Sequence, residues 1–285
     1  MTTTLDHARI ADYYKKTWYD YRGVWMNKTN RAMHYGYWDA RTVDHAASLL
    51  MMNHELATLA RIPRGARILD AGCGVGGSSM WLAERYGAAV VGITLSEFQV
   101  GKARGYAAER SLSEQVEFRR ADYCDTGFPD ESFDVVWAQE SVCYARDKSD
   151  FLREAFRVLR PGGRVAVEDG FRFRRGLPAR DESLILDWAD AWAFPDLDTI
   201  DEFRTAAKES GFVDIIDRDV TTHAMRSSRR LRRAAGIFAA PSWLGWKAGL
   251  RPREAHRNLV GARLQWAVLG GGLCGISLVT ARKPE

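Results

Sequence analysis

The sequence lacks the features that mark several large classes of protein. Its 285 residues include four cysteines and no C-x-x-C pair, so neither a disulfide framework nor a cysteine-based metal site is indicated. The net charge of +4 is too small and too evenly spread to indicate nucleic-acid binding by itself. No internal repeat is visible, and residues 1–16 lack the apolar core of a secretory signal. We therefore expect one globular, cytoplasmic unit with an elaborated cap and no bound metal.

The sequence also lacks an unbroken apolar run that could span a membrane. Residues 264–280 come closest, but Gly270, Gly271 and Gly272 interrupt them. The stretch is also shorter than the roughly 20 residues that a spanning helix needs. We expect a short helix, a glycine break and a final buried strand at residues 276–281 instead.

What the sequence does contain is an alternation of short apolar strands and helices, typical of a parallel sheet covered on both faces. Strands are predicted at residues 67–70, 88–95, 116–123, 133–139, 164–168, 211–220 and 276–281. Helices are predicted at residues 77–86, 147–160, 181–192 and 198–210, and from a capping box at Ser96–Gln99 onward. Residues 161–163, Pro-Gly-Gly, are expected to end the helix before them and to lead into the next strand.

The most informative stretch is residues 68–77, in which an apolar strand ends at Asp70 and enters a turn containing Gly72, Gly74 and Gly76. Glycines let the backbone bend tightly and let a ligand lie against bare main chain. The following helix N-terminus offers free N–H groups, which suit a carboxylate or a phosphate. Asp70 can accept a hydrogen bond from an ammonium group of a ligand. The pattern therefore predicts a ligand that carries both signs of charge.

The same turn also matches G-x-G-x-x-G, the pattern of dinucleotide-binding proteins, through Gly72, Gly74 and Gly77. A nicotinamide site would need an acid at the end of the second strand, and Thr94 stands there instead. The third strand ends in residues 122–123, Asp-Tyr, at the edge where open α/β sheets bind ligands. A nicotinamide-dependent oxidoreductase is therefore the less favoured alternative.

These features, together with the run Gly-Ile-Thr-Leu-Ser-x-x-Gln at residues 92–99, resemble the class I S-adenosylmethionine-dependent methyltransferases. The run is similar to a branch that acts on lipophilic acceptors, which includes the tocopherol, sterol and prenyl-diphosphate C-methyltransferases and the cyclopropane synthases. The resemblance implies an α/β, Rossmann-like sheet of seven strands, mostly parallel with an antiparallel last strand. It also implies a helical cap at residues 1–60, a core at 61–285 and a helical substrate-cap insertion at 222–274.

The resemblance further implies an S-adenosylmethionine site at the carboxyl ends of the first four strands. The glycine turn would face the methionine part of the cofactor, and Asp122 would contact the adenine amino group. The residues expected to bind the cofactor are Asp70, Gly72, Gly74, Gly76, Thr94, Leu95, Gln99, Asp122, Tyr123 and Gln139.

Glu140 follows the fourth strand and is expected to face the same crevice. In C-methyltransferases of the resembled branch, an acid at this place can serve as the base for the acceptor. Methyl transfer to an alkene carbon makes a carbocation, which must lose a proton to a nearby base. The plainer interpretation is a solvated loop carboxylate or a cap for the next helix.

Aromatic residues recur at spacings of three and four near the N-terminus, which would place Tyr14, Thr17, Tyr21 and Trp25 on one helical face. This segment resembles the entry segment of the sterol and tocopherol enzymes, although a buried aromatic stripe is the plainer interpretation. Tyr14 and Tyr35 are expected to touch the cofactor or the acceptor, because a buried phenol needs a hydrogen-bond partner.

Two basic runs, residues 171–175 and 226–233, have three interpretations: a solvated face, a diphosphate site, or a contact with an anionic membrane. The membrane interpretation applies to the second run and to the apolar residues after it, Ile237, Phe238, Trp243, Leu244 and Trp246. Residues 139–142 differ from the Asn/Asp-Pro-Pro-aromatic motif of base-methylating enzymes, so no nucleic-acid partner is expected. The oligomeric state is left open.

We therefore expect an S-adenosylmethionine-dependent methyltransferase that acts on a small lipophilic acceptor, such as an isoprenoid, a sterol, a quinol or a secondary metabolite, with or without a phosphate. C-methylation with Glu140 as base is the first interpretation, and O- or N-methylation of a natural product is the second. A protein that keeps the cofactor without transferring its methyl group, such as a cyclase, is an alternative from another class.

Overall fold

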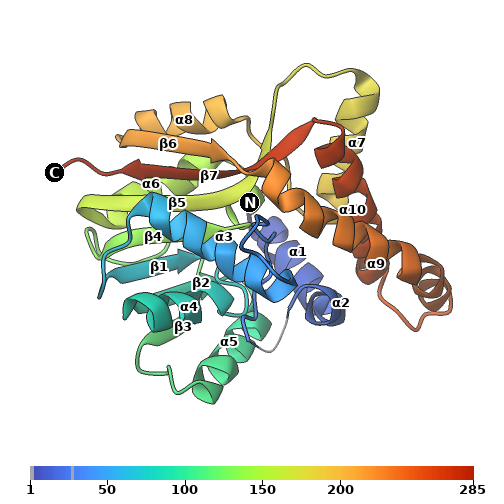
Figure 1. Cartoon of the computed structure of the whole chain (residues 1–285), viewed down its shortest axis with the longest axis horizontal. Helices are drawn as coiled ribbons and strands as arrows, with labels where there is room; N and C mark the ends of the chain where they lie inside the picture. Colours follow the sequence, from blue (N-terminus) through green and yellow to red (C-terminus); the bar gives the residue numbers. More distant parts are fainter. Residues whose placement is uncertain (1–2, 27–28) are drawn as a thin grey trace.

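The centre of the fold is a seven-stranded sheet, seen in the computed structural model, which describes residues 3–26 and 29–285 (Figure 1). The strands are β1 (Arg67–Ala71), β2 (Ala89–Thr94), β3 (Val116–Arg120), β4 (Phe133–Gln139), β5 (Leu159–Arg172), β6 (Val213–Asp219) and β7 (Cys274–Arg282). Their order in the sheet is β3-β2-β1-β4-β5-β7-β6, and β7 runs antiparallel to both of its neighbours. This arrangement confirms the predicted sheet and its antiparallel last strand.

Helices cover both faces of the sheet. One face packs against α3 (His45–Ala60), α4 (Gly77–Tyr86) and α5 (Glu97–Glu109), and the other against α6 (Lys148–Val158) and α8 (Ile200–Glu209). Successive strand residues alternate between the faces, so Ile68 joins the first core and Leu69 the second. Because the parallel strands are buried on both sides, their carboxyl ends form one edge at which loops from several strands meet.

The fifth strand begins earlier than the sequence predicts. The helix before it ends at Val158, but residues 161–163 continue β5, with a shift of register opposite Phe133, instead of forming a separate turn. Gly162 takes a positive φ of 76° and donates its N–H to the carbonyl of Lys283. The Pro-Gly-Gly segment that was predicted to end the helix is therefore an irregular part of the strand.

The predicted helical cap at residues 1–60 includes positions 1–2 and 27–28, which lie outside the described residues. Its described part holds α1 (Thr3–Lys16), α2 (Trp18–Val24) and α3. The expectation of one continuous helical face is wrong, because the helix breaks at Thr17, whose hydroxyl donates to the carbonyl of Tyr13 at 2.7 Å. The break still brings Tyr14 and Tyr21 together, with ring centroids 5.5 Å apart.

A helical pair, α9 (Thr221–Lys247) and α10 (Arg253–Gly270), occupies the chain between β6 and β7, where the 222–274 insertion is predicted. The pair projects from the end of the sheet beside α7 (Ala179–Ala191), as Figure 1 shows at the right. Residues 264–280 form the end of α10, a glycine break and most of β7. Within the described ranges, no helix has the length and apolar character needed to cross a membrane. The division into cap, core and insertion stays a prediction.

Candidate active site

The turn between β1 and α4 presents bare backbone to a cavity of about 820 Å³. Gly72, Gly74 and Gly76 have positive φ values of 90°, 54° and 83°, a region that other residues enter at a cost. A Cβ atom on Gly72 would lie 2.3 Å from the Cβ of Ser141, so this position also requires glycine for space. Gly74 lines the cavity, whereas a Cβ on Gly76 would meet the ring of Phe118 at 2.5 Å. Gly76 therefore serves packing, and its predicted role in cofactor binding stays a prediction.

Asp70 ends β1 at this cavity and is 2% exposed. Its carboxylate accepts a hydrogen bond of 2.5 Å from the hydroxyl of Ser79 in α4. Burial raises the pKa of Asp70 from 3.8 to about 7, because the charged form loses its contact with water. A cationic group bound beside Asp70 would stabilise the charged form again.

Gln139, the last residue of β4, offers an amide donor at the same cavity. Its Oε1 accepts hydrogen bonds from the indole N–H of Trp137 at 2.9 Å and from the hydroxyl of Ser78 at 2.6 Å. Because an indole N–H can only donate, these bonds fix which end of the amide is the oxygen. The Nε2 atom is then buried without a protein partner among the described residues, so it is free to donate to a ligand carboxylate.

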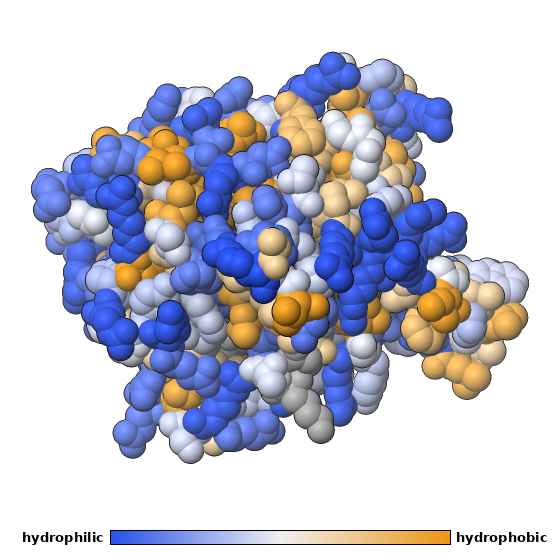
Figure 2. Space-filling view, in the orientation of Figure 1, coloured by the Kyte–Doolittle hydropathy of each residue, from blue (hydrophilic) through white to orange (hydrophobic). Residues whose placement is uncertain are grey.

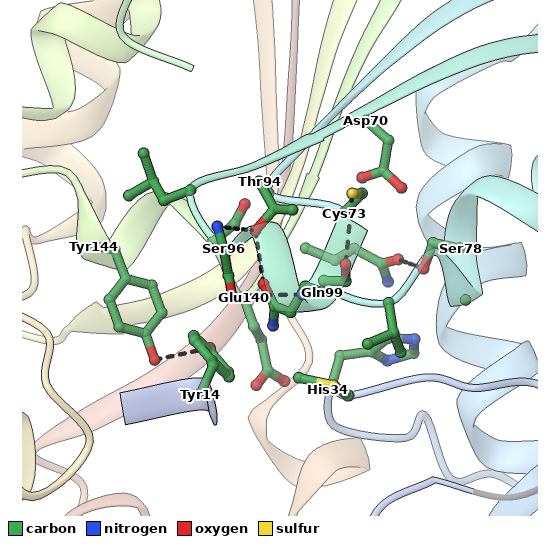
Figure 3. A pocket seen from close by; sticks show the side chains of 18 of the residues that line it. Tyr14, His34, Asp70, Cys73, Ser78, Thr94, Ser96, Gln99, Glu140 and Tyr144 are labelled. Atoms are coloured by element: carbon green, nitrogen blue, oxygen red, sulfur yellow. Dashed lines mark hydrogen bonds between the residues drawn. The ribbon is translucent and has the colours of Figure 1, made fainter. Parts of the chain in front are cut away.

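The end of β2 supplies a second group of residues at the cavity, shown in Figure 3. Thr94 donates its hydroxyl hydrogen to Oε1 of Gln99 at 2.6 Å. Ser96 caps α5 by accepting a hydrogen bond from the backbone N–H of Gln99. Only half of the predicted capping box is formed, because the side chain of Gln99 bonds to Thr94 instead of the Ser96 backbone. Leu95 and Tyr123 line the same cavity.

Asp122 lies beside this cavity rather than on its lining. It lines a neighbouring cavity under α1, which shares Leu95 and Tyr123 with the first. The Asp122 carboxylate is 3.3 Å from Nε2 of His7 on α1. The N-terminal helix therefore covers the end of the site at which the adenine group is expected, and no pattern in the sequence indicated His7.

A second cavity, of about 520 Å³, is lined mainly by aromatic rings. The rings belong to Tyr14, Tyr21, Trp25, Tyr35, Tyr144, Trp188, Trp192 and Phe194. Tyr14 and Tyr144 also line the first cavity, and their hydroxyls are joined by a hydrogen bond of 2.9 Å, which Figure 3 shows. The two cavities are therefore adjacent, and Tyr35 lies on the second only.

Glu140 lines both cavities, at the point where they meet. It adopts a positive φ of 46°, and its backbone N–H donates to the carbonyl of Glu168 at 2.7 Å. Its carboxylate accepts a hydrogen bond from the backbone N–H of Tyr35. Burial raises the pKa of Glu140 well above its usual value, and the negative charge of Asp169 raises it further. A backbone strained at this point and a carboxyl with a raised pKa are both typical of functional residues.

Two carboxylates near Glu140 were missed by the sequence reasoning. Asp169 lines the second cavity and accepts a hydrogen bond of 2.9 Å from the backbone N–H of Cys143. Glu168 is fully buried, and neither of its carboxylate oxygens has a protein partner among the described residues. Burial raises the pKa of both carboxyl groups. In the described parts of the chain, no group of His, Cys, Asp and Glu side chains is arranged to hold a metal ion.

Two arginines of the first basic run, residues 171–175, form ion pairs with carboxylates. Arg172 is buried and pairs with Glu182 at 2.8 Å and with Asp196 at 2.7 Å. Arg175 pairs with Asp196 and with Glu202. These ion pairs engage both guanidinium groups, and the diphosphate interpretation stays a prediction.

The sheet order, the glycine turn after β1 and the ligand-facing residues at the strand ends together define a class I methyltransferase. Residues 69–167 match the family model described as "Methyltransferase domain". The chain is 32% identical over 282 residues to the probable chloroplastic tocopherol O-methyltransferase of Oryza sativa subsp. japonica, covering 92% of this chain and 75% of that relative. The chain therefore belongs to the S-adenosylmethionine-dependent methyltransferases, and S-adenosylmethionine is its cofactor.

Two solved structures share the fold. A geranyl diphosphate methyltransferase in complex with geranyl diphosphate and sinefungin superposes with a TM-score of 0.77 at 22% identity, covering 98% of this chain and 99% of its own. The cyclopropane synthase MmaA2 from Mycobacterium tuberculosis superposes with a TM-score of 0.83 at 16% identity, covering 97% of this chain and 98% of its own. These two structures confirm the fold. The curated relatives, which include the rice tocopherol methyltransferase and the sterol 24-C-methyltransferase ERG6 of Saccharomyces cerevisiae (33% identical over 179 residues, covering 61% of this chain and 46% of that relative), confirm the branch that residues 92–99 indicated, and they exclude the nicotinamide-dependent oxidoreductase.

The groups at the first cavity fit S-adenosylmethionine. Gly74 leaves open space, the Nε2 atom of Gln139 is an unpartnered donor for the carboxylate of the cofactor, and Asp70 is an acceptor for its ammonium group. The binding role of each individual residue stays a prediction, including those of Thr94, Leu95 and Gln99.

We expect the affinity for S-adenosylmethionine to fall by up to about tenfold per pH unit below pH 7. The reason is that Asp70, whose pKa is about 7 in the cofactor-free chain, must lose a proton before it can pair with an ammonium group. Calorimetric titrations at a series of pH values measure this dependence. Asp70→Asn should bind more weakly and lose the dependence, and an identical pH profile in the variant would assign it to another group.

Proposed function

We propose that the protein methylates a small lipophilic acceptor held in the second cavity, with Glu140 as the proton acceptor. The observation that supports this most directly is that Glu140 lines both cavities, one suited to the cofactor and the other walled by aromatic rings. Tyr14 would touch both ligands, and Tyr35 would hold Glu140 through its backbone N–H.

The lining of the second cavity favours an uncharged reacting group. It includes the carboxyl groups of Glu140 and Asp169 but, among the described residues, no Lys or Arg side chain, so a buried anion would find no counter-ion there. An apolar acceptor bound against the aromatic rings would bury apolar surface, which stabilises its binding. We therefore propose an acceptor whose reacting end is an isoprenoid, sterol, quinol or similar apolar group, with any phosphate lying outside the second cavity.

For methyl transfer to carbon, the cofactor provides the methyl group and the protein provides the base. S-adenosylmethionine supplies a methyl group bonded to a positively charged sulfur. When the π electrons of an acceptor double bond form the new carbon–carbon bond, the methyl–sulfur bond breaks and a carbocation remains on the acceptor. The deprotonated form of Glu140 then takes a proton from the adjacent carbon, and the electrons of that C–H bond restore the double bond. The rings of Tyr21 and Trp25 stabilise the positive charge, and α1 and α2 help to exclude water.

Methylation of a hydroxyl oxygen is the second candidate. It is favoured by the name of the rice relative, a probable tocopherol O-methyltransferase at 32% identity. Glu140 in its deprotonated form would serve the same purpose there, taking the hydroxyl proton as the oxygen bonds to the methyl carbon and the methyl–sulfur bond breaks. The two candidates share the site and differ in the atom that receives the methyl group.

An acceptor screen tests the proposal. The chain is incubated with S-adenosylmethionine and with isoprenoid alcohols, sterols or quinols, while S-adenosylhomocysteine is measured and the product is analysed by NMR. We expect S-adenosylhomocysteine to form together with a methylated apolar product, whose methyl shift distinguishes carbon from oxygen. Turnover only with charged acceptors would contradict the proposal, and a product formed without S-adenosylhomocysteine would favour a cyclase.

The proposed acceptors also bear on where the protein works. All four cysteines are unpaired, which suits the reducing cytoplasm that the sequence predicts. Apolar acceptors partition into membranes, so we propose that the protein contacts a membrane surface from the aqueous side.

A further inference from the structure

The helical pair α9 and α10, together with its connection, carries a large excess of positive over negative charge. Residues 221–270 contain ten Lys and Arg residues and one acidic residue, Glu254, a net charge of +9. The whole chain carries +4, so the rest carries −5. Arg251 and Arg257 pair with carboxylates of other elements, whereas Arg232 and Arg233 lie exposed on α9. The pair is therefore a strongly basic projection on an otherwise acidic molecule.

The same projection ends in exposed apolar side chains. We define the hairpin tip as residues 237–250, the end of α9 and the start of its connection to α10. Ile237 is 70% exposed, Leu244 60% and Leu250 86%, and Phe238 and Trp243 are exposed beside them. In Figure 2, orange and pale-orange atoms gather on the projecting lobe at the right, at the end of the helical pair. A cluster of large exposed apolar side chains marks an interaction surface.

We propose that the hairpin tip docks on an anionic lipid surface. Its apolar side chains would enter the headgroup region, while the cations of α9 remain among the negatively charged headgroups. Charge favours this occupant over a second copy joined tip to tip, because two hairpins of +9 would repel each other. The tip would rest on the bilayer rather than cross it.

The hairpin is also connected to the second cavity, which links docking to the proposed function. The hydroxyl of Tyr35 donates to Oε1 of Gln265 in α10 at 2.9 Å, and the indole N–H of Trp192 donates to the carbonyl of Asn258 at 3.2 Å. Tyr35 and Trp192 both line that cavity. Because α10 contacts residues that line the second cavity, docking would bring this cavity close to the bilayer in which an apolar acceptor dissolves. This consequence rests on the proposed function.

Vesicle binding tests the docking without any acceptor or cofactor, so its outcome is independent of the proposed function. The full chain is sedimented with vesicles of phosphatidylcholine alone and with vesicles that also contain phosphatidylglycerol. We expect binding to the anionic vesicles that is at least tenfold tighter than to the neutral ones and that weakens as salt is added. Equal binding to both, or no binding to either, would overturn the proposal.

Two variants assign the binding to the hairpin. Arg232→Gln with Arg233→Gln should weaken binding to anionic vesicles by about 30-fold, from about fivefold for each charge. Arg64→Gln with Arg85→Gln, which removes two exposed charges from the core domain, is the matched control and should bind much more tightly than the hairpin variant. Equal losses in the two variants would show that net charge, and not the hairpin, causes the binding.

The apolar contribution is tested separately. The triple change Phe238→Ser, Leu244→Ser and Leu250→Ser should weaken vesicle binding at least tenfold, because it removes the groups that enter the headgroup region. Val43→Ser, at a side chain 82% exposed in the N-terminal segment, is the matched control. Unchanged S-adenosylmethionine affinity verifies the fold of each variant. A triple variant that binds vesicles like the wild type, or a tip-dependent dimer found by light scattering without vesicles, would overturn the docking.

Discussion

Glu140→Gln is expected to bind S-adenosylmethionine with nearly unchanged affinity while turnover falls about 10²- to 10⁴-fold. The amide keeps the size of the side chain, and its oxygen can still accept the hydrogen bond from Tyr35. It cannot take a proton from the acceptor, however, so the positive charge or the hydroxyl proton is left in place. Calorimetry measures cofactor affinity, and S-adenosylhomocysteine formation at saturating acceptor measures turnover.

Glu168→Gln is the matched control for this prediction. Glu168 is a buried carboxyl group on the adjacent strand, hydrogen-bonded through its backbone carbonyl to Glu140, and it is not part of the lining described for either cavity. The change removes a titratable group from the same surroundings without removing the proposed proton acceptor. Equal losses in both variants would point to the electrostatics of the cluster, and full turnover in Glu140→Gln would remove Glu140 from catalysis.

The sequence was sufficient to predict the fold because its signals are local. The helix at residues 77–86 and the strand at 133–139 agree with α4 and β4, since a glycine turn and an apolar run mark them within a few residues. The break at Thr17 was not predicted, because regular aromatic spacing continues through it. At the break, the Thr17 hydroxyl bonds to a carbonyl of the preceding turn, a contact that spacing does not reveal.

The cofactor cavity was predicted better than the contacts that shape it. Asp70, Gly72 and Gly74 lie together on its lining because they are neighbours in one turn. By contrast, the hydrogen bond from Tyr35 to Glu140 joins residues 105 positions apart, and no local pattern encodes it. The contact of His7 with Asp122 is likewise formed only when α1 folds over the sheet.

Some residue types also have two uses that a sequence does not distinguish. A glycine with positive φ can line a cavity, as Gly74 does, or can make room for a ring, as Gly76 does for Phe118. An arginine in a basic run can be exposed, as Arg233 is, or buried between carboxylates, as Arg172 is. Only packing decides between these uses, because the partner comes from another element.

Gly74→Val is expected to reduce the affinity for S-adenosylmethionine by at least about a hundredfold. A Cβ at this position would have its nearest neighbour, the Cε of Met33, 3.9 Å away, so the two methyl groups of valine would occupy space at the cavity in which the cofactor is expected to lie. The φ of 54° adds backbone strain, since a β-branched residue adopts this region only with difficulty. Calorimetric titration measures the affinity directly.

Gly65→Val separates the two effects in Gly74→Val. Gly65 has a similar positive φ, 73°, but a Cβ there would meet no atom within 4 Å and would lie in the loop before β1, apart from the described lining of the cavity. Both variants should therefore lose about 1–2 kcal/mol of stability in thermal unfolding, whereas only Gly74→Val should lose the cofactor. If Gly74→Val bound S-adenosylmethionine as tightly as Gly65→Val, the methionine part of the cofactor would have to lie away from the turn between β1 and α4.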